Sequence, residues 1–251
     1  MPTIAALYRY PVKGLSAEPL AEVALTPGGT IPWDRAWAIE NGPSGFDPAA
    51  PRTLPKILFL MLMRNERLAE LATRFDDATR TLTVRRDGAL VAEGCLDTEE
   101  GRRAIETYFD MFAANDLRGP AKILTAPGFS FSDTASKVVS LINLETVRAI
   151  GHEIGATVHP LRFRGNLHVE GLSAWDEFGW VGKEVTIGGV TFTATKRIDR
   201  CAATNVDPVT AKRDLAIPVA LQKAYRHADC GIYLKVIAGG RMAVGDEVSG
   251  G

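Results

Sequence analysis

The sequence predicts a mainly β protein of the α+β kind, in which barrel-like sheets carry a few peripheral helices. Three observations lead to this fold class. Many short segments alternate apolar and polar residues, several of them flank two-residue turns rich in glycine, and the helical patterns stand singly instead of alternating with strands. In addition, no GxGxxG or GxxxxGKS/T motif follows a predicted strand, which argues against a dinucleotide-binding fold and a P-loop.

The first elements are predicted to be short strands. Ile4–Tyr10 is an apolar run that stops at Pro11, which has no amide hydrogen to donate to a ladder. Leu20–Leu25 alternates and ends at a Pro-Gly-Gly turn, and Trp33–Glu40 is the next candidate strand. Glycine, proline and serine then predict a loop over residues 41–51.

Strand and helix patterns are mixed in the next stretch. Ile57–Met63 is predicted to be a buried strand, whereas Glu66–Phe75 carries apolar residues at helical spacing and is predicted to be a helix. Thr81–Val84 and Ala89–Val91 lie on either side of an Asp-Gly turn and predict a hairpin. A helix over Thr98–Ala113 follows, with the threonine as its cap.

The best domain boundary lies at residues 117–120 (Leu-Arg-Gly-Pro), which divides the chain into an N-terminal domain over 1–118 and a C-terminal domain over 119–251. Early in the second domain, Asn143 can cap a short helix that runs from Leu144 to Ile150 and stops at Gly151.

The C-terminal part continues with hairpins and one more helix. Val185–Ile187 and Val190–Ala194 flank a Gly-Gly turn and form the clearest hairpin of the chain. Proline opens a helix over Pro218–His227. Ile232–Ile237 and Met242–Val248, separated by Gly-Gly, predict a closing hairpin.

Composition limits the classes of partner. Lys and Arg number 29 and Asp and Glu 30 in 251 residues, so no general basic surface for nucleic acid is expected. The longest strongly apolar run, Ile57–Met63, is too short to cross a membrane, and no secretory signal pattern opens the chain. The three cysteines cannot all pair, and the four histidines lack the spacing of zinc ligands. We therefore expect a cytoplasmic protein that binds neither nucleic acid nor membranes.

Cys201 is the first residue with possible chemistry. Lys196, Arg197 and Arg200 surround it in the sequence, and cations stabilise a thiolate, which can serve as a metal ligand or a nucleophile. The alternative is a small buried hydrophobe, because free cysteines are among the most buried residues. Cys95 and Cys230 lack such a basic neighbourhood, and we interpret both as structural.

Several cations could bind an anion. Arg162 and Arg164 would share one face of a strand, where an anionic partner would relieve their repulsion; the alternative is a solvated edge strand. Lys13 lies in a turn bounded by proline and glycine and could present its charge to an anion, or be merely solvated. Asp34 and Arg35 lie between two tryptophans and could form a half-buried ion pair.

Four motifs occur in the order in which one family carries them: YPVKG at Tyr10–Gly14, DRAW at Asp34–Trp37, RFRGN at Arg162–Asn166 and RCAATNVDP at Arg200–Pro208. Over nearly its whole length the chain resembles the MOSC family, named for the C-terminal domain of molybdenum cofactor sulfurase. It is most similar to the subgroup with an N-terminal β-barrel domain, which includes the mitochondrial amidoxime-reducing component.

The resemblance implies that the chain folds as a MOSC β-barrel with a barrel-like N-terminal domain and binds the molybdenum cofactor, a pterin whose dithiolene gives two sulfurs to the metal. Cys201 would supply a third sulfur as the molybdenum ligand, which agrees with the affinity of such centres for thiolate. Family members also carry an association with pyridoxal phosphate. The residues implied to hold the pterin or its phosphate are Lys13, Arg35, Arg162, Arg164, Asn166, Arg200 and Thr204.

The function implied is that of a molybdenum-dependent oxidoreductase that reduces N-hydroxylated or N-oxide compounds. Its partners would be a small-molecule substrate and a separate electron-donor protein, since three scattered cysteines cannot hold a four-cysteine iron–sulfur cluster. Asp207 is a candidate proton relay or a turn stabiliser. Two alternatives stay open: a sulfur carrier with a persulfide on Cys201, and a non-catalytic protein that binds the molybdenum cofactor.

Three positions depart from the family pattern. Gly165 replaces a common proline, and Gly14 replaces the serine of some members. Glu66–Phe75 is expected to be a helical insertion, which would change the shape of the pocket.

Overall fold

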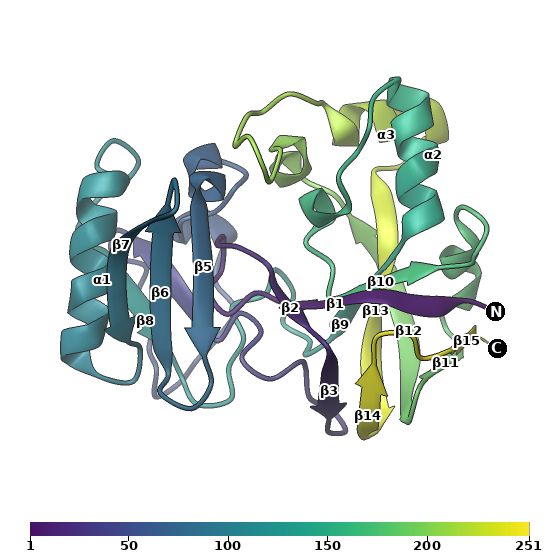
Figure 1. Cartoon of the computed structure of the whole chain (residues 1–251), viewed down its shortest axis with the longest axis horizontal. Helices are drawn as coiled ribbons and strands as arrows, with labels where there is room; N and C mark the ends of the chain where they lie inside the picture. The colour runs from purple at the N-terminus through teal and green to yellow at the C-terminus, as the bar shows by residue number, and fades with distance from the viewer. Residues whose placement is uncertain (251) are drawn as a thin grey trace.

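The computed structural model describes residues 1–250, where strands dominate and three α-helices occur. The predicted mainly β fold with a few peripheral helices is therefore confirmed. Figure 1 shows two bodies side by side, a smaller one from the early part of the chain and a larger one that holds both termini.

The larger body is built on a curled eight-stranded sheet with the order β15-β11-β12-β13-β9-β10-β1-β2 (Figure 1). Neighbouring strands are antiparallel except β9 and β10. Alternate side chains such as Val185, Phe192 and Leu234 are fully buried and form its core. The strands are β1 (Thr3–Arg9), β2 (Glu18–Leu20), β9 (Val139–Asn143), β10 (Leu167–Glu170), β11 (Glu184–Ile187), β12 (Val190–Asp199), β13 (Asp229–Ala238) and β15 (Val248–Gly250).

The helix α2 (Leu144–Ile154) packs on this sheet, and α3 (Ile217–Tyr225) packs on α2 (Figure 1). Asn143 caps α2 as predicted, and α3 lies within two residues of its prediction. The predicted stop of α2 at Gly151 is wrong. The helix continues through that residue and ends at Gly155, which adopts the left-handed conformation (φ 72°) that glycine allows.

The smaller body contains a three-stranded sheet and a strand pair, both in contact with helix α1 (Glu99–Phe112). The predicted cap is confirmed, because the Thr98 side chain accepts a hydrogen bond from the Gly101 amide over 3.1 Å. Ile105 and Phe109 of the helix are fully buried against the strands. These strands are β4 (Trp37–Asn41), β5 (Leu71–Asp76), β6 (Thr81–Arg86), β7 (Ala89–Cys95) and β8 (Ala121–Thr125).

Two of the three predicted hairpins are confirmed. β6 and β7 pair around Asp87–Gly88, both with positive φ, and β11 and β12 pair around Gly188–Gly189. The predicted closing hairpin is wrong. Only Gly239 separates β13 from β14 (Gly240–Ala243), which is too short for a two-residue turn, and β14 instead pairs with β3 (Glu22–Leu25).

Both predictions for residues 57–75 are wrong. Ile57–Met63 forms no strand: it begins in a 3₁₀ turn, Lys56–Leu58, and joins another strand only through an isolated bridge from Phe59 to Glu40. The expected helical insertion at Glu66–Phe75 is a 3₁₀ turn followed by strand β5. Its buried side chains are four residues apart, a spacing that fits one face of a strand as well as a helix.

The chain begins and ends in the larger body, because β1 and β2 belong to the same sheet as β9 to β13. The first strands therefore complete a sheet whose other strands come from the second half of the sequence. The division at 118/119 stays a prediction. Within residues 1–250, no helix has both the length and the apolar character that crossing a membrane requires.

Candidate functional site

A cavity of about 500 Å³ lies where the two bodies meet, and its walls come from both. Cationic residues outnumber acidic ones in the lining. The acidic ones are Asp34, Asp133 and Asp199. The cationic ones are Lys13, Arg35, Lys56, Arg162, Arg164, Lys196, Arg197 and Arg200. A concave site with such an excess of positive charge concentrates anions, although the whole chain has a net charge of only −1.

The residues that the sequence motifs single out converge on this cavity from distant parts of the chain. Those in the lining are Lys13, Arg35, Arg162, Arg164, Asn166, Arg200, Cys201 and Thr204. Asp207 is not among the described residues that line it. The roles assigned to these residues stay predictions; what the structure adds is their common location.

Cys201 lies on the cavity wall at the end of the segment that follows β12, where it precedes the 3₁₀ turn Ala202–Asn205. The Thr204 hydroxyl donates to the Cys201 carbonyl over 3.0 Å and closes that turn. The sulfur-bearing residue is partly exposed, whereas Cys230 is fully buried, and burial raises the pKa of the Cys230 thiol to about 12. The description of a buried small hydrophobe therefore fits Cys230 and not Cys201.

Arg162 and Arg164 do not share the face of a strand, and that prediction is wrong. Pro160–Phe163 forms a 3₁₀ turn, because proline cannot donate to a ladder and the His159 ring accepts a hydrogen bond from the Leu161 amide over 3.2 Å. Arg164 then adopts the left-handed conformation (φ 51°), so the two side chains leave in different directions.

Arg164 extends toward the loop after β1. Its Nη1 donates to the Leu15 carbonyl over 2.7 Å, and its guanidinium lies 4.3 Å from the centre of the Tyr10 ring. The Arg35 guanidinium lies 4.6 Å from the same ring. Burial, and then the neighbouring Arg35 charge, lower the pKa of Arg164 to about 10. Its buried Nη2 has no hydrogen-bond partner among the described residues, which leaves one donor free for a ligand.

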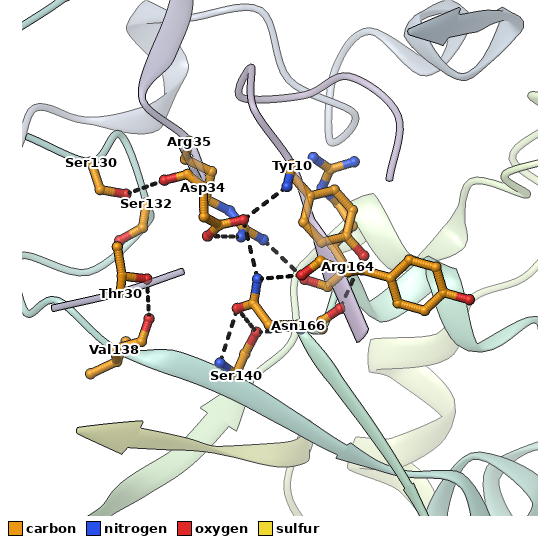
Figure 2. Close-up of polar contacts among 12 residues, drawn as sticks. Tyr10, Thr30, Asp34, Arg35, Ser130, Ser132, Val138, Ser140, Arg164 and Asn166 are labelled. Atoms are coloured by element: carbon orange, nitrogen blue, oxygen red, sulfur yellow. Dashed lines mark hydrogen bonds and ion pairs between the residues drawn. The ribbon is translucent and has the colours of Figure 1, made fainter. Parts of the chain in front are cut away.

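The Asp34 carboxylate, part of the cavity lining, connects several of the neighbouring residues by hydrogen bonds (Figure 2). It accepts the Tyr10 amide over 2.9 Å, the Asn166 side-chain amide over 3.1 Å and the Arg35 guanidinium over 2.5 Å. The predicted ion pair between Asp34 and Arg35 is confirmed. Asn166 is 2% exposed, and its side-chain oxygen also accepts two hydrogen bonds from Ser140. Its amide therefore holds the frame of the cavity together.

Arg162 supports the segment beyond Cys201. Its guanidinium donates to the Asn205 carbonyl over 3.0 Å and pairs with Asp207 over 2.7 Å and Asp214 over 2.8 Å. The other oxygen of Asp207 accepts the amides of the two residues after Pro208 over 2.9 and 2.8 Å. Burial opposes ionisation of this carboxyl, but the two amides and Arg162 outweigh it and lower its pKa. These contacts favour the turn-stabilising role of Asp207 over a proton relay.

Lys56 and Asp133 are among the lining residues that the sequence motifs do not mark. Asp133 pairs with Lys13 and lies 3.6 Å from the Lys56 amine. Burial opposes the charge of each group. It lowers the pKa of Lys13, whereas Lys13 and Lys56 together keep the pKa of Asp133 below its usual value. Burial lowers the pKa of Lys56, but its neighbours Asp133 and Cys201 outweigh this effect and raise the pKa, so this amine belongs to the surroundings of the sulfur. Neither residue lies in a motif that could have marked it.

Comparison with known proteins gives two matches that together span most of the chain. The model of the MOSC N-terminal beta barrel domain matches residues 1–116, and that of the MOSC domain matches residues 127–249. The human protein named mitochondrial amidoxime reducing component 2 is 35% identical over 98 residues, which cover 34% of this chain and 29% of that protein. The chain thus matches less than a third of the length of this relative.

Two solved structures show weaker likeness. The YUAD protein from Bacillus subtilis is 15% identical with a TM-score of 0.44, covering 99% of this chain and 94% of its own. YiiM from Geobacillus stearothermophilus is 14% identical with a TM-score of 0.36, covering 45% of this chain and 53% of its own.

Proposed function

Because this chain is a member of the MOSC family that joins a MOSC N-terminal beta barrel domain to a MOSC domain, we propose that it is a molybdenum-cofactor-dependent oxidoreductase. Its substrates would be N-hydroxylated or N-oxide compounds, in keeping with the name of its human relative. The observation that carries the proposal is that the Cys201 thiol and eight cationic side chains line one cavity.

The residues present suit the cofactor. Thiolate is a ligand that soft metal centres prefer, and Cys201 is the one cysteine among the described residues of the cavity wall. The pterin carries a phosphate, which arginine and lysine bind well. Arg164 has a buried donor without a partner in the described chain, and Arg35 lies beside it. We assign Cys201 to the metal and Lys13, Arg35, Arg164 and Arg200 to the negative charge of the pterin phosphate.

The protein's own contribution would be to bind, orient and balance charge. The bound cofactor would supply the two-electron redox chemistry that breaks a nitrogen–oxygen bond. In the overall reaction an N-hydroxyl compound takes up two electrons and two protons and yields the amine or amidine and water. Both electrons would come from a separate donor protein. Arg200, which donates to the Cys230 and Phe163 carbonyls, and Thr204 would keep the segment that carries Cys201 in place.

Metal analysis of matched cysteine variants tests the proposal. Protein made in a host competent for cofactor synthesis is expected to contain about one molybdenum per chain and to reduce an N-hydroxylated compound with an artificial electron donor. Cys201→Ser should lose this activity, whereas Cys95→Ser, changed outside the described cavity lining, should keep both metal and activity. Full metal content and undiminished reduction in Cys201→Ser would reject the ligand assignment.

The same preparation separates the two alternatives. A sulfur carrier would contain no molybdenum and would show a persulfide on Cys201 by mass spectrometry. A non-catalytic binding protein would contain molybdenum but would show no turnover with any electron donor.

A further inference from the structure

A second cavity, of about 330 Å³, adjoins the first and differs from it in chemistry. Aliphatic residues and proline dominate its lining, including Leu15, Leu62, Leu68, Leu71 and Val206. Its one acidic residue in the described chain, Glu70, already pairs with Arg67 and Arg86. We call this space the apolar cavity; its volume lies within the range of roughly 300–1,000 Å³ typical of small-molecule sites.

The apolar cavity shares part of its walls with the first cavity, which we call the cationic cavity. Gly14, Leu62, Arg162, Arg164 and Ala203 line both, and Ala203 is only two residues from Cys201. The shared wall also holds two buried donors that find no partner within residues 1–250, the Nε of Arg162 and the Nη2 of Arg164. Unpaired buried donors are rare in folded proteins, and an oxygen acceptor of a ligand would satisfy them.

We infer that the apolar cavity binds the nonpolar substituent of an uncharged N-hydroxylated substrate, whose polar end lies at the wall shared with the cationic cavity. This inference rests on the proposed function and names the substrate class more closely. Substrates with an alkyl or aryl body would be preferred over small polar ones, because burying aliphatic surface stabilises the complex. An organic anion would bind less tightly in the apolar cavity, since the aliphatic lining would remove water from its charge.

The two ends of such a substrate need different surroundings. The aliphatic end needs no hydrogen-bond partners, whereas the hydroxyl and nitrogen at the other end accept and donate hydrogen bonds. An oxygen at the shared wall could accept from Arg162 and Arg164. This arrangement would direct the nitrogen–oxygen bond toward the cavity that contains Cys201.

A chain-length series tests this inference without relying on turnover. The cofactor-free full-length protein is titrated by calorimetry with linear alkyl hydroxamic acids from acetohydroxamic to octanohydroxamic acid, which are uncharged at neutral pH. Affinity is expected to rise up to about fourfold per methylene until the cavity is filled. An affinity that stays flat along the series would overturn the inference.

Three variants test whether the hydroxamic acids bind in the apolar cavity. Ala69→Phe, which fills part of the apolar cavity, should abolish the dependence on chain length and leave acetohydroxamic acid unaffected. Val209→Asp is a second test variant that should fold normally, because Val209 lines the cavity and is 76% exposed. It should weaken the binding of octanohydroxamic acid at least tenfold. The matched control is Val219→Asp, 69% exposed on α3 and not among the described lining residues of either cavity. Equal binding by Val209→Asp and Val219→Asp would contradict the assigned location.

The cofactor-loaded enzyme distinguishes this inference from the proposed function. If it reduces acetohydroxamic acid while binding shows no dependence on chain length, the reaction stands and the inference is overturned. If long hydroxamic acids bind as expected but none is reduced, the proposed reaction fails, and the apolar cavity stands as the site of this ligand class.

Discussion

At the scale of single residues, Asp207 decides between catalysis and support. One of its oxygens pairs with Arg162, the other accepts two backbone amides, and Asp207 is not among the described residues that line the cavity. We expect Asp207→Asn to lower the free energy of unfolding by about 1–3 kcal/mol, because hydrogen bonds to a charged group are weakened, while Asp214 still pairs with Arg162. Urea denaturation measures this loss.

The same variant is informative about activity. If Asp207 only stabilises the turn, the dependence of the turnover rate on pH should keep its shape in Asp207→Asn, even if the maximum rate falls. Loss of one limb of that profile would instead support a proton relay.

His168 predicts how stability depends on pH. This side chain is 4% exposed and packs against the Tyr8 ring, and burial lowers its pKa from 6.5 to about 4. Between these values the unfolded chain binds more protons than the folded one. Stability is therefore expected to fall as the pH drops from about 6.5 to about 4, by at most about 3 kcal/mol. Urea denaturation at several pH values measures the free energy of unfolding. This free energy should depend less on pH in His168→Phe than in the wild type, while the exposed-site variant His152→Gln should behave like the wild type.

Residues of the cavity were predictable only where the sequence marked them with a motif. Lys13, Arg164 and Cys201 drew attention through turn residues or neighbouring charges, and they do meet at one cavity. Lys56 and Asp133 belong to no pattern, because their contact joins loops far apart in the chain. Spacing along the sequence describes local geometry, and the convergence of loops depends on the packing of the whole fold.

At the scale of elements, the close packing of α1 on β7 depends on a glycine pair. A Cβ atom on Gly101 would lie 2.2 Å from the Cys95 carbonyl oxygen, and one on Gly94 would lie 2.1 Å from that of Gly101. We expect Gly101→Ala to destabilise the protein by about 1–3 kcal/mol, although alanine favours an isolated helix by about 1 kcal/mol. Thermal unfolding of Gly101→Ala is compared with that of Glu100→Ala, a change at an exposed neighbour in the same turn. An increase in the stability of Gly101→Ala would contradict the role of the glycine in packing.

Element prediction succeeded where turn chemistry was specific and failed where spacing was ambiguous. Asp87–Gly88 and Gly188–Gly189 fixed two hairpins, since few residues accept a positive φ. Leu71 and Phe75, four residues apart, suit one face of either a helix or a strand, and pairing with β6 decides for the strand. The apolar run Ile57–Met63 contributes buried side chains but is not a strand of a sheet, because within the described chain it pairs with a strand only through one isolated bridge.

At the scale of the whole molecule, the two predicted domains exchange strands. β1 pairs with β10, β3 with β14 and β4 with β8, so in residues 119–251 alone three strands would lose a partner and expose an open edge. We expect this fragment to aggregate and to lack the cooperative unfolding of the full chain. Co-expression with residues 1–118 should restore a soluble complex. Size-exclusion chromatography and thermal unfolding check both outcomes, and a monomeric, cooperatively folded 119–251 fragment would show that the first strands are dispensable.

The wall of the cationic cavity extends in sequence from Lys13 to Tyr233. During translation, a ribosome that has released only the first half of the protein has exposed Lys13, Arg35 and Lys56 without the thiol they would face. The complete wall first exists when the chain through Tyr233 has left the exit tunnel. This cavity can therefore acquire a ligand only after Tyr233 has been released, and truncated products that stop before this residue would not compete for the ligand.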